Sequence, residues 1–222
     1  MTKARLVPLD GYIEYTPEQM LSRARKFYEN MKRRRTVRDF SDKPVPRELI
    51  EQVIMTAGTA PSGANMQPWH FVVVSDPQVK KEIRQAAEQV EKEFYEQRAP
   101  DYWLRDLEHL ATDSDKPHLE QAPYLIVVFS QRHKLDTDGA ITHHYYLGES
   151  VGISMGMLIT AIHQAGLVSL THTPHPMSFL RKLLDRPKHE TPVLILAVGY
   201  PKDGARVPDI SKKNLNEIAT FV

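Results

Sequence analysis

Apolar residues recur at helical spacing in two segments near the N-terminus. The first follows a capping-box pattern that begins at Thr16, with proline at the first helical position, and continues to about Lys32. The second follows Pro46 and ends near Gly58, a residue type that commonly terminates helices. We therefore expect two amphipathic helices in this part of the chain.

Four short apolar runs predict strands. They cover residues 71–74, 124–129, 167–171 and 192–200. Further helical patterns lie between them, over about residues 77–96, 146–164 and 178–184. The chain carries neither the glycine-rich dinucleotide fingerprint nor a P-loop, so neither of these nucleotide sites is expected. The pattern as a whole predicts a single α+β domain.

Three segments have distinctive compositions. The helix at 146–164 is apolar all round, which predicts burial in a core or at a subunit interface. Residues 100–117 are polar, with scattered aromatics and no clean periodicity, which is typical of a mobile lid. The tail at about 201–222 has little core of its own, so we expect it to reach across a partner surface.

Composition narrows the possible functions. Lys and Arg total 29 against 28 Asp and Glu, and this net charge of +1 argues against a protein that binds nucleic acid as a whole. The absence of cysteine excludes disulfides, cysteine nucleophiles and thiolate metal sites. No targeting segment is visible, and the purest apolar runs fall far short of the roughly 20 residues that span a membrane. We expect a soluble, cytoplasmic protein without a membrane partner.

The sharpest local motif is a run of four arginines within residues 33–38. Guanidinium groups can hold a phosphate through paired hydrogen bonds, so a small phosphorylated ligand is one interpretation. A solvated basic surface is another. Nucleic acid is less favoured, because no aromatic residues are interleaved with the run.

Two further motifs could meet a ligand. The small residues of 61–65, with sequence PSGAN, would let backbone amides approach a ligand closely, although most such loops are only turns. Thr171 and Thr173 lie at the end of a predicted strand, where their hydroxyls could face a cofactor or simply cap a turn.

The histidines give little support for a metal site. His143 and His144 are adjacent and cannot point the same way on a strand or a helix, and no carboxylate cluster accompanies them or the pair His172 and His175. No motif places a serine nucleophile on a strand-to-helix elbow, so a hydrolase is not expected either.

Six segments together carry a family resemblance. They are RRRTVRDFSDKPVP (33–46), AGTAPSGANMQPWHFVVVSDP (57–77), APYLIVVF (122–129), AGLVSLTHTP (165–174), LLDRPKHE (183–190) and VGYPKDGARVPD (198–209). In this order they resemble the FMN-dependent nitroreductase superfamily, and within it the branch that removes iodine from iodotyrosines. The resemblance implies a nitroreductase-like fold, with a central mixed sheet flanked by helices, in an intertwined homodimer. Residues 1–26 would form an arm and the start of the first helix, and 27–222 one FMN domain with a lid at about 90–117.

The resemblance implies FMN as the cofactor. The implied contacts are Arg34, Arg35, Thr36, Arg38, Pro61, Ser62, Gly63, Thr171, Thr173 and Lys213. The arginines would hold the phosphate and ribityl chain, and Lys213, or alternatively Lys212, stands where the family has an arginine. Thr173 is the implied catalytic residue, because a hydrogen bond from it to flavin N5 would favour one-electron steps.

The resemblance also implies a clamp for the amino acid group of a halotyrosine. Glu91 and Tyr95 are four residues apart and share one helix face, and Lys116 follows in the lid. The carboxylate can pair with the substrate ammonium, and the lysine with its carboxylate. Trp103 would shield the site from water, and the backbone amide of Ala64 would hold the phenolate oxygen. Taken alone, the same residues could decorate a charged surface helix and a loop.

The implied activity is the reductive removal of iodide from 3-iodotyrosine, with tyrosine as the product. The implied partners are the halotyrosine, a separate electron donor and a second copy of the chain. One alternative is a general FMN nitroreductase acting on nitroaromatics or quinones, and another is a non-catalytic FMN-binding or ligand-sensing protein. Vertebrate members of the branch carry a membrane anchor that is not visible here, so a soluble, bacterial-type member is expected.

Overall fold

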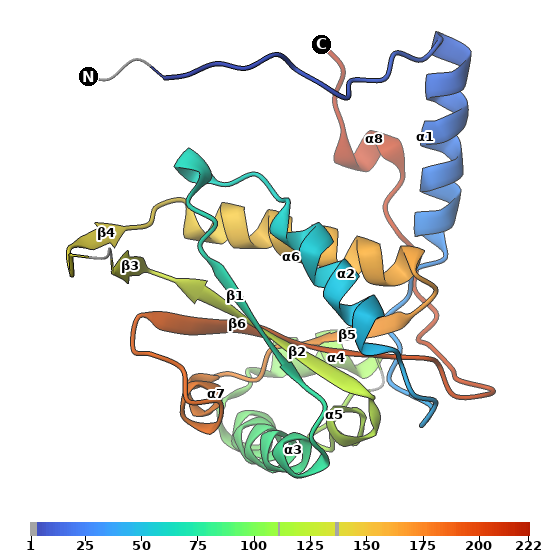
Figure 1. Ribbon diagram of the computed structural model, residues 1–222. Helices are drawn as coiled ribbons and strands as arrows, with labels where there is room; N and C mark the ends of the chain where they lie inside the picture. Colours follow the sequence, from blue (N-terminus) through green and yellow to red (C-terminus); the bar gives the residue numbers. More distant parts are fainter. Residues whose placement is uncertain (1–3, 111, 136–137) are drawn as a thin grey trace. The chain divides into compact units, whose positions relative to one another are not determined.

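A computed structural model describes residues 4–110, 112–135 and 138–222 (Figure 1). The chain forms two compact units, residues 1–34 and 35–222. The helix of the first unit, α1 (Pro17–Lys32), begins with the predicted capping box. The Thr16 amide donates to the Gln19 side chain at 3.0 Å, and the Gln19 amide donates to the Thr16 hydroxyl at 3.3 Å. Both the cap and the end of this helix are therefore confirmed.

The second unit is built on a sheet with the strand order β1-β2-β6-β5 (Figure 1). Its strands are β1 (Trp69–Val74), β2 (Tyr124–Gln131), β5 (Val168–His172) and β6 (Glu190–Gly199). Each strand coincides, within two residues at either end, with one of the predicted apolar runs. In this order β1 and β5 occupy the two edges, and β2 and β6 separate them.

Pairing in this sheet differs from the mixed pattern that the resemblance implies. All three neighbouring strand pairs are antiparallel. A parallel contact occurs as an isolated bridge between Thr36 and Ser169 of β5, strengthened by the Val37 amide, which donates to the Ser169 carbonyl at 3.3 Å. The mixed character is therefore confined to the point where the arginine-rich segment joins the edge of the sheet.

Both faces of the sheet are buried, as the nearly uninterrupted apolar runs of its central strands require. Along β2, Leu125, Val127 and Phe129 face one core cluster, whereas Ile126 and Val128 face the other. The first cluster is covered by α3 (Pro77–Glu93), α5 (His118–Gln121) and α7 (Ser178–Leu183). The second is covered by α2 (Arg47–Gly58) and α6 (Leu147–Gln164).

The lid region is more regular than its lack of periodicity suggests. The chain continues from α3 into a π-helical turn, η2 (Phe94–Arg98), and then into α4 (Asp101–Glu108). Pro100 precedes α4, Asp101 lies in its first turn and Arg105 in its last, an arrangement that favours a short helix. The remaining short elements are η1 (Gly63–Asn65), β3 (His133–Leu135), β4 (Ile141–His143) and α8 (Leu215–Ile218).

The apolar helix α6 is not enclosed on every side within this chain. Val151, Leu158 and Ile162 are buried against the sheet, but Gly152 and Ile153 are exposed. Within the ranges that the structure describes, no helix combines the length and hydrophobicity needed to cross a membrane.

Candidate active site

Residues expected to bind substrate and cofactor converge on one cavity of about 480 Å³ beside the end of β5. Those lining it are Arg38, Glu91, Tyr95, Trp103, Lys116, Thr171 and Thr173. They come from α3, η2, α4, β5 and three connecting segments, so residues that are far apart in the sequence meet in the folded chain. A cavity of this size, with a few convergent polar groups in a partly apolar wall, is typical of a small-molecule site.

The bridge to β5 positions Arg38 in this cavity. Pairing of Thr36 with Ser169 aligns the two segments, so that Arg38 lies beside Thr171, two residues farther along the strand. The Arg38 side chain is about half buried, and burial lowers the pKa of its guanidinium. No described carboxylate forms an ion pair with it. A cation that is partly removed from water and lacks a countercharge fits an anionic ligand such as a phosphate.

Glu91 and Lys116 form the most deeply buried ion pair of the cavity. The Lys116 ammonium lies 3.5 Å from the Glu91 carboxylate, and the two side chains are only 3% and 15% exposed. Burial raises the pKa of Glu91, an effect that Lys116 partly offsets. Lys116 also donates to the Thr112 hydroxyl at 3.2 Å and to the Asp113 carbonyl. The two ends of the expected amino acid clamp therefore contact each other.

Aromatic residues close the side of the cavity next to the clamp. Phe94 stacks edge-to-face on Tyr95, with ring centroids 5.6 Å apart, and on Trp103 at 5.1 Å. The Lys116 ammonium lies 5.7 Å from the centroid of the Tyr95 ring. Burial raises the pKa of the Tyr95 hydroxyl, which keeps it a neutral hydrogen-bond donor. The π-helical turn places Tyr95 at the same cavity as Glu91, as their spacing predicts.

A network on α3 anchors the segment that carries Lys116. Arg84 bonds Glu88 at 2.7 Å, Asp115 at 2.8 Å and Glu120 at 3.3 Å. Glu88 in turn accepts a hydrogen bond of 2.8 Å from the Lys116 backbone amide. Sequence reasoning missed this network, because its four acidic and basic side chains look like an ordinary charged helix surface until the segments meet.

Sequence reasoning also missed two histidines in the wall of the cavity. His118 begins α5 and His172 ends β5, and their rings lie edge-to-face with centroids 5.7 Å apart. His172 Nε2 lies 3.9 Å from a Glu91 oxygen. The sequence held one indication that His172 belongs to the site, because it lies between Thr171 and Thr173, which were both predicted to bind the cofactor.

The 61–64 loop lies elsewhere in the unit. It precedes β1, at the opposite edge of the sheet from Thr171 and Thr173, and none of its residues lines the cavity of about 480 Å³. The Gly63 amide donates to the Ser150 hydroxyl of α6 at 3.3 Å, and a Cβ at this position would lie 2.8 Å from the Tyr146 ring. Ala64 has a φ of 47°, which is strained for a residue with a side chain. One chain therefore does not bring this loop to the other predicted residues.

The predicted phosphate ligands are distributed over both units. Arg34 belongs to the first unit and Arg35 to the second, where its guanidinium donates to the Pro208 carbonyl of the tail. Lys213 is exposed and does not line the cavity. The roles expected for Arg34, Arg35 and Lys213 stay predictions.

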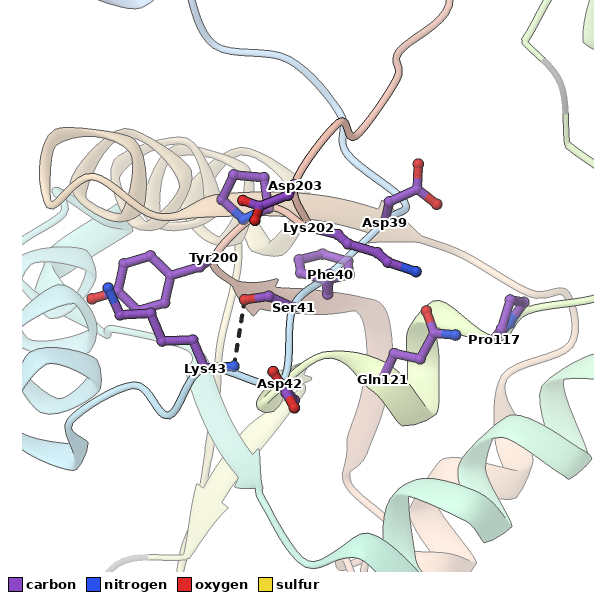
Figure 2. Close-up of a pocket in the computed structure, with 11 residues that line it drawn as sticks. Asp39, Phe40, Ser41, Asp42, Lys43, Pro117, Gln121, Tyr200, Lys202 and Asp203 are labelled. Carbon is purple, nitrogen blue, oxygen red and sulfur yellow. Dashed lines mark hydrogen bonds between the residues drawn. The ribbon is translucent and has the colours of Figure 1, made fainter.

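A second cavity, of about 890 Å³, lies between the 39–43 segment and the end of β6 (Figure 2). None of the predicted site residues lines it. The Lys43 ammonium lies 4.2 Å from the centroid of the Tyr200 ring, and the Ser41 amide donates to the Tyr200 carbonyl at 3.0 Å. The charged residues here, Asp39, Asp42, Lys43, Lys202 and Asp203, are exposed to solvent. This cavity is a polar groove, whereas the smaller one encloses its charges.

Comparison with known proteins agrees with this geometry. A model described as "Nitroreductase family" matches residues 31–200. The chain belongs to the nitroreductase family. It is 54% identical over 212 residues to an iodotyrosine deiodinase of Haliscomenobacter hydrossis, covering 96% of this chain and 95% of the relative. An iodotyrosine deiodinase of Nematostella vectensis is 46% identical over 204 residues, with coverage of 91% and 77%.

A solved structure similar to this chain has the same fold. It is an oxidized iodotyrosine deiodinase bound to FMN and 3-iodo-L-tyrosine, and it superposes with a TM-score of 0.76 at 33% identity. The match covers 88% of this chain and 100% of that structure. The family resemblance and the α+β fold inferred from sequence are confirmed.

Proposed function

We propose that this protein is an FMN-dependent reductive dehalogenase of 3-halotyrosines. The observation that carries the proposal is the convergence of Glu91, Tyr95 and Lys116 on the cavity that Arg38 and Thr173 also line. A carboxylate and a buried ammonium complement the two charges of a free amino acid, and a phenol can supply a further hydrogen bond. The two relatives named as iodotyrosine deiodinases support the same substrate class.

The residues of the cavity fit FMN as the cofactor. A phosphate would supply the countercharge that Arg38 lacks among the described residues. The hydroxyls of Thr171 and Thr173 can hydrogen-bond heteroatoms of the flavin ring. The FMN bound by the solved relative supports this assignment. Bound FMN in its reduced form would supply, one at a time, the two electrons that dehalogenation consumes.

The reaction replaces a carbon–halogen bond with a carbon–hydrogen bond. Halotyrosine takes up two electrons and one proton, and tyrosine and halide leave. Glu91 would bind the substrate ammonium and Lys116 its carboxylate, so both must exchange their mutual contact for contacts with the substrate. Trp103 and Phe94 would exclude water once the amino acid group is bound. Recognition of the zwitterion would thus position the halogenated ring for reduction.

We further propose that the active protein is a homodimer in which each site takes the 61–64 loop from the second chain. The loop precedes one edge strand of the sheet, whereas Thr171 lies in the other edge strand and Thr173 directly follows it, so two intervening strands hold loop and threonines apart by roughly 14 Å within one chain. A second copy of the chain can bring its own 61–64 loop to the cavity of the first chain. Its loop would bring Ser62 and Gly63 to the flavin and the Ala64 amide to the phenolate oxygen.

The exposed side of α6 supports the dimer. Gly148, Gly152 and Gly156 recur every four residues, and a Cβ at each would meet open space within 4 Å. Ile153 is exposed beside them. An apolar helix with an open stripe of small residues can pack closely against a second helix. Replacing Gly152 with leucine should therefore weaken dimerisation, as measured by sedimentation equilibrium or by light scattering at several protein concentrations.

An anaerobic reaction tests the activity. The flavin of the purified holoenzyme is reduced, 3-iodotyrosine is added, and flavin reoxidation is followed together with tyrosine and iodide. Equal amounts of reoxidised flavin, tyrosine and iodide are expected. Reoxidation by a nitroaromatic but not by 3-iodotyrosine would overturn the proposal in favour of a general nitroreductase. Failure of both would indicate a non-catalytic flavoprotein.

A further inference from the structure

The wall behind Glu91 contains two buried imidazoles with unsatisfied nitrogens. His118 and His172 are only 4% and 7% exposed. In each ring Nε2 is fully buried and has no hydrogen-bond partner among the described residues. A buried polar atom without a partner is costly, so its retention calls for an explanation.

The two oxygens of Glu91 face different groups. Oε2 lies 3.5 Å from the Lys116 ammonium, and Oε1 lies 3.9 Å from His172 Nε2. When a substrate ammonium takes the place of Lys116, the carboxylate loses its partner on one side only. The imidazole on the other side keeps its position, because His172 ends β5 and its backbone pairs with Ile195 of β6.

We propose that His172 is a positioning residue that donates its Nε2–H to Glu91 and thereby orients the carboxylate toward the ammonium group of the substrate. This inference rests on the proposed function and deepens it. The present separation is about 1 Å longer than a hydrogen bond. Hydrogen bonds in binding sites often shorten when the substrate binds.

Electrostatics explain why a neutral donor suits this position. Burial, followed by the proximity of His118, Lys116 and Arg38, lowers the pKa of His172 to about 3, so the ring is uncharged near neutral pH. A neutral donor orients the carboxylate without cancelling its charge. A lysine or arginine here would compete with the substrate ammonium for Glu91.

The tautomer follows from the chemistry of the partner. A neutral imidazole has one N–H, and an ionised carboxylate only accepts hydrogen bonds. His172 must therefore carry its proton on Nε2. Glutamine can place a neutral N–H donor at nearly the same distance from the backbone, whereas leucine fills the space without donating.

These properties define the test. Dissociation constants are measured for the oxidised holoenzyme by flavin fluorescence, with 3-iodotyrosine and with 3-(4-hydroxy-3-iodophenyl)propionate, which lacks the ammonium. His172→Leu should weaken 3-iodotyrosine binding about tenfold or more, and binding of the analogue less than about twofold. His172→Gln should restore most of the lost affinity for 3-iodotyrosine. A merely structural role would weaken both ligands alike, and that result would overturn the proposal.

Two further variants sharpen the assignment. In a Glu91→Gln background, His172→Leu should have little additional effect on 3-iodotyrosine, because the carboxylate it orients is gone. His118→Leu is the matched control, since it removes an equally buried imidazole from the same wall; it should change the binding of both ligands alike. An ammonium-specific loss in His118→Leu, or full additivity with Glu91→Gln, would overturn the proposal. If wild-type holoenzyme failed to bind 3-iodotyrosine at all, the proposed function itself would be wrong.

Discussion

The two cavities of the larger unit differ in the solvent exposure of their charged side chains. The cavity of about 890 Å³ beside β6 keeps its aspartates and lysines in water, whereas the cavity of about 480 Å³ beside β5 encloses Glu91 and Lys116. Exposed charges change the free energy of folding little, but a buried charge destabilises the folded state by several kcal/mol unless it is paired. Enclosed charges in a cavity therefore indicate function more strongly than volume does. Variants of the two cavities should differ accordingly.

The largest effect is expected from Glu91→Gln, which removes the charge that we propose pairs with the substrate ammonium. We expect kcat/KM for 3-iodotyrosine to fall about 100-fold or more, while reduction of a nitroaromatic stays within about twofold. The measurement is steady-state turnover of both substrates by the holoenzyme. Asp203→Asn, in the other cavity, serves as the control and should change neither. An equal loss with both substrates would contradict the role of Glu91 in recognising the zwitterion.

Arg38→Gln should have the next largest effect, because it removes the half-buried cation that we assign to the FMN phosphate. FMN affinity should fall on the order of 10- to 100-fold. Fluorescence titration of the apoprotein with FMN measures this change. Lys202→Gln removes an exposed cation from the other cavity and should leave FMN affinity unaltered. Unchanged affinity in Arg38→Gln would place the phosphate elsewhere.

The two buried histidines of the smaller cavity, His118 and His172, should make stability depend on pH. Burial, with Lys116 and Arg38 nearby, lowers the pKa of His118 to about 4, and that of His172 is about 3. As pH falls below about 6.5, the unfolded chain binds protons that the native chain does not, so the free energy of unfolding decreases. The expected loss at pH 5 is on the order of 2 kcal/mol for each imidazole.

Urea denaturation at pH 7 and pH 5 measures this dependence. Replacing both His118 and His172 with glutamine should flatten the dependence of the free energy of unfolding on pH between these values. The exposed His109 provides the control, and His109→Gln should leave the slope as it is in the wild type. If the free energy of unfolding still depended on pH in the double variant as it does in the wild type, other groups would be responsible for the titration.

The smallest effect is expected from Arg84→Gln. Arg84 supports Lys116 only indirectly, through Glu88 and Asp115, and its side chain is partly exposed. We expect a loss of about 1 kcal/mol in the free energy of unfolding and a few-fold rise in KM for 3-iodotyrosine. Unaltered kcat together with the raised KM would identify a positioning effect. A large loss of kcat would mean that Arg84 acts more directly.

Local sequence patterns were sufficient for most of the fold. The capping box at Thr16, the proline before α2 and the four apolar runs each act within a few residues, so their consequences follow from the chain itself. α4 was missed because a short helix has too few turns to show periodicity. The sequence left open whether a core or a subunit interface covers α6, because its glycines and isoleucine are apolar whichever element packs on them.

The family motifs also identified side chains that meet in one cavity, because Glu91, Tyr95 and Lys116 could be matched by type and spacing. Other features depend on contacts between distant segments. The Thr36–Ser169 bridge, the Arg84 network and the approach of His172 to Glu91 form only when strands and helices pack. Periodicity and composition were thus enough to predict the helices and strands and to show which functional groups are available, since these are local properties. Tertiary packing decided which charges are buried and which groups face one another, because desolvation and long-range pairing exist only in the folded chain.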